Sequence, residues 1–355
     1  MARRRKVARG RFFILVAAIG VGAMATFGIR HRLAQPGHPA TSASPAAPSA
    51  SVPLAWMPAP FRLPYPVAGA AGAVSSQAIW LAGGFDTAGT HRSVLAITPR
   101  GATVFARLPY PVHDAAAAVA ANHLWVLGGG VLQSQNLIQW VDLRNGTSRA
   151  VAGLPLPLSD LSAAYWNHHL YAIGGHDAGP PLPFVWRLAL PARSHPVGPP
   201  FAVLPQGLRY AAVAEEDKTV WIAGGVTPHG LSATVLTVDL QTGAVHRKPS
   251  LPVPTAYAAA AVWNGQLMVI GGKTPRGWTA ATWRWNAHRK IWESGPPLPA
   301  PAGDGLALIF DQQLFWLGGM VQGRPASVVW ILRPSTSVKG QTREGKAQAT
   351  KKAAR

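Results

Sequence analysis

The stretch IWLAGG at residues 79–84, in which four apolar residues run into a pair of glycines, decides the fold because it recurs along the chain. Five similar stretches follow: LWVLGG at 124–129, LYAIGG at 170–175, VWIAGG at 220–225, LMVIGG at 267–272 and LFWLGG at 314–319. The first glycines of successive pairs lie 45, 46, 50, 47 and 47 residues apart. A period of this length is the signature of a repeat protein, in which each repeat is one supersecondary unit.

A second marker, the dipeptide Leu-Pro, keeps the same period. Its leucines are Leu63, Leu108, Leu154, Leu204, Leu251 and Leu298. Because two independent markers recur six times with one spacing, the middle of the chain divides into six units that start near these leucines.

Each unit is predicted to contain four short strands. An alanine-rich stretch, such as AAAAVA at 115–120, precedes the apolar strand that ends in Gly-Gly. A third strand with alternating pattern, such as VLTVDL at 235–240, and a turn at 241–243 lead into the fourth. Alternating apolar residues and Gly-containing turns are typical of strands and hairpins. The sequence therefore predicts an all-β fold, and radial repetition of four-stranded units predicts a six-bladed β-propeller.

The composition agrees with many short strands joined by turns. Of 355 residues, 37 are glycine and 33 proline, beside 14 tryptophans. Cysteine is absent, which excludes disulfides, thiolate metal sites, iron–sulfur clusters and a cysteine nucleophile. Alanine and glycine in the first strand of each unit leave room for six sheets to converge on one axis.

The ends of the repeat region predict how the ring closes. The sixth unit stops after its third strand, SVVWILRP at 327–334, and lacks a fourth. The segment VPLAWMPAPFR at 52–62 resembles the missing strand. We therefore expect residues 53–335 to form one propeller in which 53–62 completes the last blade, since an unpaired edge invites aggregation.

The formal net charge of +20 is concentrated at the chain ends. Residues 1–32 carry eight basic residues and no acidic one, and residues 338–355 carry six basic residues and one acidic one. The region between them keeps 19 basic and 12 acidic residues. Since no basic stripe with interleaved aromatic residues runs through the repeats, nucleic-acid binding is not expected.

Residues 12–29 form an uncharged apolar run behind the basic segment 1–11. As a helix the run would span about 27 Å, close to the hydrocarbon thickness of a bilayer. The basic flank predicts a single-pass cell-membrane protein with a cytoplasmic N-terminus and an extracytoplasmic propeller. An alternative stays open, because Ala23-Met24-Ala25 also fits a signal-peptidase site, and cleavage after Ala25 would give a secreted protein.

Two segments lack the apolar periodicity of a folded core. Residues 30–52 are rich in Pro, Ala and Ser and predict a linker. Residues 336–355 are rich in Lys, Gln, Thr and Ala and predict a basic, disordered tail.

The repeats resemble the kelch family of β-propellers, in a membrane-anchored bacterial form. The resemblance covers residues 53–335 and rests on the Gly-Gly pair, a third-strand aspartate at Asp142 and Asp239, and the Trp285 to Trp292 spacing. Kelch propellers are most often binding platforms, and a minority are enzymes. The resemblance therefore implies a monomeric propeller that recognises a protein or a cell-envelope glycan through one face.

Polar residues recur at one position of the repeat, fourteen residues before the first glycine of each pair. Because these positions begin the innermost strands, they should form a ring around one mouth of the central channel. The six positions are Gly69, Asp114, Asp160, Tyr210, Tyr257 and Asp304. His113 and Arg209 precede two of them, and these two with the five polar ring residues are the candidate ligand-binding residues. A structural alternative is that the aspartates only cap loop N–H groups.

Catalytic signatures are sparse, so a binding protein is favoured over an enzyme. The motifs HExxH, GxSxG and GxxxxGK[ST] are absent, and neither a metal nor a cofactor is predicted. The copper-radical oxidases of the kelch class need a Tyr–Cys cross-link, which the absence of cysteine rules out. The family resemblance leaves one enzymatic alternative, a sugar-acting enzyme similar to the sialic-acid mutarotases and epimerases, with Arg209, Asp114 and Asp304 as acid–base candidates.

Overall fold

The computed structural model describes residues 53–190 and 198–335, and in these ranges all regular secondary structure is β-strand. The prediction of an all-β fold is confirmed. The described ranges contain no helix that is long and apolar enough to span a membrane. The predicted anchor at 12–29, the predicted linker at 30–52 and the predicted tail at 336–355 all lie outside the described residues.

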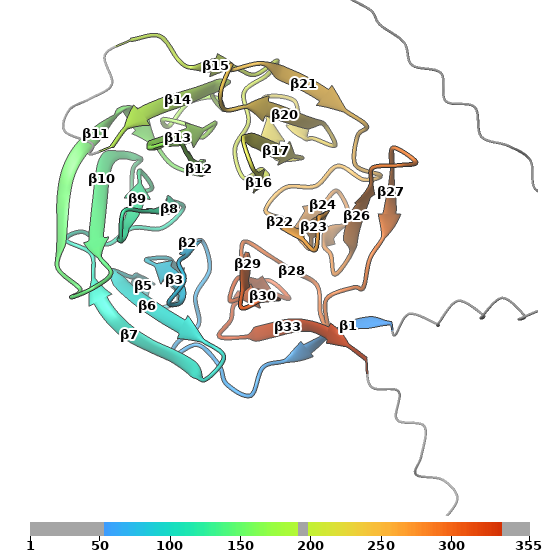
Figure 1. The fold of residues 1–355 in the computed structure, drawn as a ribbon, viewed down its shortest axis with the longest axis horizontal. Coiled ribbons are helices and arrows are strands. Elements are labelled where there is room, and N and C mark those ends of the chain that lie inside the picture. The colour runs from blue at the N-terminus through green and yellow to red at the C-terminus, as the bar shows by residue number, and fades with distance from the viewer. Residues whose placement is uncertain (1–52, 191–197, 336–355) are drawn as a thin grey trace, which may run out of the picture. The chain divides into compact units, whose positions relative to one another are not determined.

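The strands form six four-stranded antiparallel sheets around a central axis (Figure 1). In each sheet the chain order runs from the axis outward, except in the last, where the outer strand comes from the start of the described region. From the axis outward, the first sheet contains β2 (Ala71–Val74), β3 (Ile79–Ala82), β6 (Ser93–Thr98) and β7 (Gly101–Arg107), and the second contains β8 (Ala116–Ala120), β9 (His123–Leu127), β10 (Gln135–Asp142) and β11 (Ser148–Leu158). The third contains β12 (Ser162–Trp166), β13 (His169–Ile173), β14 (Phe184–Ala189) and β15 (Ala202–Val203), and the fourth contains β16 (Ala212–Glu216), β17 (Thr219–Ala223), β20 (Val235–Asp239) and β21 (Val245–Lys248). The fifth contains β22 (Ala259–Trp263), β23 (Gln266–Ile270), β26 (Thr282–Asn286) and β27 (Ile291–Ser294), and the sixth contains β29 (Leu306–Phe310), β30 (Gln313–Leu317), β33 (Val329–Pro334) and β1 (Leu54–Pro58).

Short two-residue strands lie in four of the six segments that follow the Gly-Gly pairs. Each of these four segments forms a hairpin, and in the last unit a further short strand, which precedes the innermost strand, pairs with the hairpin. These strands are β4 (Phe85–Asp86), β5 (Gly89–Thr90), β18 (Val226–Thr227), β19 (Gly230–Leu231), β24 (Lys273–Thr274), β25 (Gly277–Trp278), β28 (Ala302–Gly303), β31 (Met320–Val321) and β32 (Arg324–Pro325).

The last sheet joins the two ends of the described region. β1 pairs antiparallel with β33, from Leu54 opposite Pro334 to Pro58 opposite Trp330. The Ser335 N–H also donates to the Pro53 carbonyl at 2.7 Å. Through β33 and β30 the register places residues 53 and 335 at the end of the sheet away from the start of β29.

The hydrophobic core consists of six clusters, each between two neighbouring sheets. Trp80, Trp125 and Tyr171 of the second strands are buried in three of them. Each buried aromatic side chain removes about 150–250 Å² from water, or about 4–6 kcal/mol at 25 cal/mol/Å² before entropy is counted. These second-strand aromatics are therefore structural.

The Gly-Gly pairs bring the backbones of neighbouring sheets into contact. The second glycine of each pair donates its N–H to a carbonyl of the next unit, from Gly84 to Val112 at 2.8 Å through to Gly319 and Val67 at 2.7 Å, which closes the circle. At Gly83, where φ is +67°, an added Cβ would lie 2.1 Å from the Val112 carbonyl oxygen. Only glycine permits both this backbone conformation and this approach.

Candidate functional site

The six equivalent positions form a closed ring of backbone hydrogen bonds at one end of the channel. The N–H of each position donates to the carbonyl of the preceding one at 2.8 to 3.1 Å, and Gly69 closes the ring onto Asp304. We call this set of Gly69, Asp114, Asp160, Tyr210, Tyr257 and Asp304 the ring.

Every ring residue has a left-handed backbone, with φ between 53° and 59°. This conformation costs a non-glycine residue roughly 1–2 kcal/mol, and it is unusual for a side chain as large as tyrosine. The same backbone geometry at all six positions shows that the hydrogen-bonded ring imposes it. Five polar side chains are thereby held at one level of the channel.

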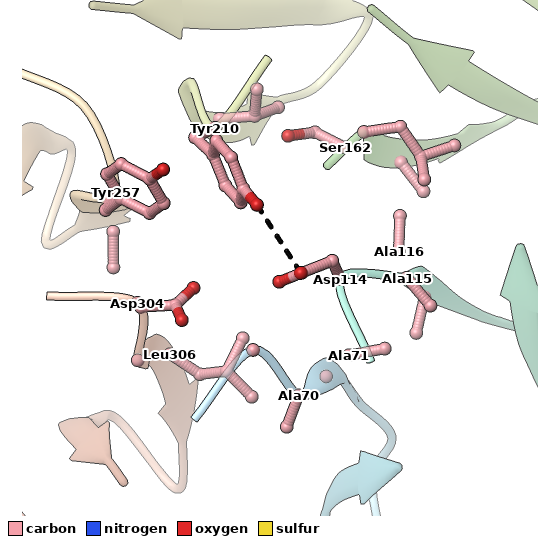
Figure 2. Close-up of a pocket in the computed structure, with 18 of the residues that line it drawn as sticks. Ala70, Ala71, Asp114, Ala115, Ala116, Ser162, Tyr210, Tyr257, Asp304 and Leu306 are labelled. Atoms are coloured by element: carbon pink, nitrogen blue, oxygen red, sulfur yellow. Dashed lines mark hydrogen bonds between the residues drawn. The ribbon is translucent and has the colours of Figure 1, made fainter. Parts of the chain in front are cut away.

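The ring side chains line a pocket of about 200 Å³ at the start of the innermost strands. Below the ring its wall consists mostly of alanine, with Ser162 and Leu306 among the exceptions. Asp114, Tyr210, Tyr257 and Asp304 converge on the pocket from the loops that precede the innermost strands of four different sheets (Figure 2).

Asp160 is the one ring carboxylate with a full set of partners. Its Oδ2 lies 2.9 Å from Arg209 Nη1 and 3.0 Å from His176 Nε2, and only 3% of its side chain is exposed. Arg209 Nη1 and His176 Nε2 are themselves 3.2 Å apart. A buried carboxylate needs such compensation, and the guanidinium supplies it.

Asp114 is much less well compensated. It accepts a long hydrogen bond from the Tyr210 hydroxyl at 3.4 Å, and His113 Nε2 lies 3.7 Å away. Burial, and then the charge of Asp160, raise its pKa to about 7, against the opposing effects of the Tyr210 hydrogen bond and Arg209. Near neutral pH the Asp114 carboxyl is therefore able to take up or release a proton.

Asp304 makes no side-chain hydrogen bond within the part of the chain that the structure describes, and it points into the pocket (Figure 2). Burial raises its pKa well above the ordinary value, and the charges of Asp114 and Asp160 add to the effect. An unpartnered carboxyl in this position favours its neutral form until a cation or donor reaches it.

An aromatic wall completes the pocket. The rings of Tyr210 and Tyr257 stack with centroids 4.0 Å apart and 29° between their planes. Trp278 of β25 packs edge-on against Tyr257 at 5.9 Å. Burial raises the pKa of both tyrosines, so their hydroxyls stay protonated.

The other two predicted residues, His113 and Arg209, do not line the pocket. His113 Nδ1 lies 2.9 Å from the Thr90 hydroxyl, its ring packs against Phe85, and burial lowers its pKa. Arg209 stands behind Asp160. The structure thus brings the five polar ring residues together around one pocket and places His113 and Arg209 in a supporting layer.

Sequence reasoning missed Glu215 at the other end of the channel. The lining there includes the residues five positions after the ring, namely Val74, Val119, Tyr165, Glu215, Val262 and Ile309. The Glu215 side chain is exposed to the channel, and its carboxylate accepts the Tyr165 N–H at 3.1 Å. Desolvation by the surrounding channel wall raises its pKa to about 7. The available signal was one acid at a repeat position that is otherwise apolar or aromatic.

Two contacts of the ring were also unforeseen, namely the pairing of His176 with Asp160 and the packing of Trp278 on Tyr257. Both come from segments after a Gly-Gly pair, whose lengths vary between units. Within residues 53–190 and 198–335, no group of three or more His, Asp or Glu side chains is placed to hold a metal ion.

Comparisons with known proteins support the fold alone. No family model matches the chain, and no curated protein matches its sequence. Among solved structures, the chain is similar to the structure of YjhT, with a TM-score of 0.67 and 16% identity over 78% of this chain and 97% of that chain. This likeness supports a β-propeller of the kelch-like kind.

Proposed function

We propose that this protein is a membrane-anchored, extracytoplasmic binding protein, a six-bladed kelch-like propeller that recognises a protein or glycan partner through its ring end. The ring carries this proposal, because it delivers three carboxyl groups and two stacked tyrosines into one pocket. A concave site with a few convergent polar groups and perturbed pKa values is the general mark of a binding site. Capping of loop N–H groups, the structural alternative, does not account for Asp304, which makes no such bond among the described residues.

The position of the described termini supports recognition at the ring end. Residues 53 and 335 lie next to each other, at the end of the sheets opposite the ring. The described chain therefore begins and ends at the end of the propeller away from the pocket, which supports recognition at the ring end.

A glycan array probed with the purified full-length chain tests this function. We expect selective binding that Asp304→Asn weakens, since this substitution removes the charge while asparagine still tolerates the left-handed backbone. Glu215→Gln, a matched loss of a carboxylate at the opposite end of the channel, should leave the binding unchanged. Binding that responds equally to both substitutions, or that neither affects, would contradict recognition at the ring.

The proposed anchor at 12–29 has its own test in the native host. The full-length chain should sediment with membranes and resist extraction by carbonate, and protease added to intact cells with a permeable outer envelope should reach the propeller. Recovery of the intact chain in the soluble cytoplasmic fraction would overturn this placement.

One observation favours a second candidate, a sugar-acting enzyme similar to the sialic-acid mutarotases. The Asp114 carboxyl has a pKa of about 7 and lies beside the unpartnered Asp304, which suits general acid–base chemistry at neutral pH. Arg209 has a different position from the one the sequence suggested, since it pairs with Asp160. Proton NMR of sugar anomers mixed with the protein distinguishes the candidates: an increase in mutarotation rate that Asp114→Asn abolishes favours the enzyme.

A further inference from the structure

The backbone N–H groups of the ring are all hydrogen-bonded within the ring. All six ring N–H groups donate to the neighbouring ring carbonyl, so none of them is directed at a ligand. Each carbonyl that accepts one of these bonds keeps a second lone pair. At the level of the ring, the backbone offers the pocket acceptors and no free donors.

The side chains around the pocket repeat this imbalance. Tyr210 donates its hydroxyl proton to Asp114, and Ser162 donates to the Ala211 carbonyl at 3.4 Å. Among the lining side chains other than the carboxyl groups, only the Tyr257 hydroxyl is a donor without a hydrogen bond to a described residue. The lining contains three carboxyl groups and no Lys, Arg or His.

The positive charge near the pocket lies beside only one of the three ring carboxyl groups. The nearest guanidinium, that of Arg209, is bound to Asp160 together with His176. Asp114 faces Asp160, Tyr210, Arg209 and, at 3.7 Å, His113 Nε2, whose pKa is lowered by burial. Asp304 faces Asp114 and Asp160 without a cation of its own. The pocket can therefore accept one further positive charge next to Asp114 and Asp304.

The aromatic wall offers hydroxyl oxygens and ring edges rather than an open ring face. Tyr210 and Tyr257 stack on each other with centroids 4.0 Å apart, and the Arg209 guanidinium carbon lies 5.5 Å from the Tyr210 centroid. Both tyrosines stand beside Asp114 and Asp304 in the same pocket (Figure 2). The three donors of an ammonium group can therefore be shared between the two carboxylates and the Tyr257 hydroxyl oxygen.

We propose that the pocket binds a primary ammonium group, held by the Asp114 and Asp304 carboxylates against the Tyr210–Tyr257 wall. The proposal deepens the proposed function and rests on it. The volume of about 200 Å³ is below the roughly 300–1,000 Å³ of sites that enclose a whole small ligand. The pocket therefore takes the amine-bearing tip of a larger ligand, and an anionic sugar is disfavoured because it would meet the carboxyl groups.

Binding of the ammonium group displaces a proton from the pocket. The raised pKa of Asp114 and of Asp304 means that the empty pocket holds protons near neutral pH, whereas the ion pair needs carboxylates. The ammonium group of a lysine side chain has a pKa near 10.4 and stays charged over this range, so the pH dependence is read with the lysine probe. Affinity should therefore increase as the pH rises from about 5.5 to about 8, through the pKa of about 7 of Asp114.

Isothermal titration calorimetry on the purified full-length chain tests the proposal with two matched pairs of probes. The first pair is Nα-acetyl-lysine amide and its Nε-acetylated form, and the second is glucosamine and N-acetylglucosamine. We expect the amine of at least one pair to bind, with the heat depending on the ionisation enthalpy of the buffer because a proton is released. The pair that responds identifies the source of the ammonium group.

Two variants distinguish a specific loss of amine binding from a general loss of the fold. Asp304→Asn should weaken amine binding roughly tenfold to a hundredfold, the usual range for a hydrogen bond to a charged group, and Glu215→Gln should leave it unchanged. Equal binding of the acetylated probes, affinity that falls as the pH rises, or absence of binding by both amines would overturn the ammonium proposal. A partner found on the glycan array that carries no amine would overturn it while leaving the proposed function intact.

Discussion

The two ends of the central channel are built from the same six strands but differ in chemistry. At the ring end, five of six positions carry Asp or Tyr, and the backbone is left-handed and joined in a closed circle. Five residues further along, the positions are mostly Val or Ile, and only Glu215 is charged. The repeat therefore fixes where side chains meet, while the residue type at each position is free to create a site at one end only.

Loss of a partnered carboxylate at the ring end should have the largest effect on stability. Asp160→Ala leaves Arg209 and His176 beside each other without their shared acceptor, and we expect the free energy of unfolding to fall by about 3 kcal/mol. Urea denaturation followed by tryptophan fluorescence measures the change. Glu215→Ala is the control, with an expected change below about 1 kcal/mol, and an equal loss in both variants would remove the distinction between the two ends.

The pH dependence of stability should be the next largest effect. Asp114 and Asp304 have raised pKa values in the folded protein, so the folded state binds more protons than the unfolded state. Their stabilising contribution is present at low pH and is lost as pH rises from the unfolded pKa of about 4 towards the folded values. The melting temperature should therefore decrease between pH 4.5 and 7.5.

The variant Asp304→Asn should make that decrease shallower, because it removes one of the two carboxyl groups whose pKa is raised in the folded protein. The difference between the variant and the parent isolates the ring from the other titrating groups. An unchanged slope in Asp304→Asn would show that its carboxyl ionises in the folded protein as it does in the unfolded chain.

At the Glu215 end of the channel we expect a smaller effect of opposite sign, namely a gain in stability. Glu215→Val supplies the residue found at Val74, Val119 and Val262 and removes a carboxylate whose pKa of about 7 reflects desolvation. At pH 8 we expect a gain below about 1 kcal/mol, since solvent screens part of the desolvation penalty of this exposed carboxylate and the hydrogen bond from the Tyr165 N–H is lost. A loss of stability at pH 8 in thermal denaturation would show that the Glu215 carboxylate has a structural role.

The smallest expected effect compares the two stacked tyrosines. Tyr210→Phe removes the hydroxyl that donates to Asp114 and should cost about 0.5–1.5 kcal/mol. Tyr257→Phe keeps the stack and removes a hydroxyl that makes no hydrogen bond to a described residue, so chemical denaturation should show little change. A greater cost for Tyr257→Phe would contradict the hydrogen-bond assignment.

The sequence was sufficient for the all-β fold because the Gly-Gly pairs and the Leu-Pro dipeptides share one period. Periodicity also selected the ring: equal spacing from the first glycine picks out Asp114, Asp160 and Asp304, which the structure places around one pocket. The left-handed backbone of the ring residues could not be predicted from local propensity. A tyrosine with φ above 50°, such as Tyr210, depends on hydrogen bonds to neighbouring sheets.

Pairings across units could not be predicted in the same way. His176 and Arg209 belong to segments of different length in neighbouring units, and only the folded structure shows that both reach Asp160. Glu215 was overlooked because the search followed the polar position of the repeat, whereas the informative feature was an acid at an apolar one. The sequence likewise does not reveal that, of the three ring aspartates, Asp160 is the one that pairs with an arginine.

The most direct test is a carboxyl ¹³C NMR titration of the full-length chain labelled at its nine aspartates. The account predicts that the Asp114 resonance, assigned through Asp114→Asn, titrates near pH 7. The Asp304 resonance, assigned through Asp304→Asn, should titrate well above the ordinary range of an aspartate, and both should shift to lower pKa when a primary amine is added. Titration of both residues near pH 4, with no response to the amine, would contradict the claim that the ring end holds uncompensated carboxyl groups for a cationic ligand.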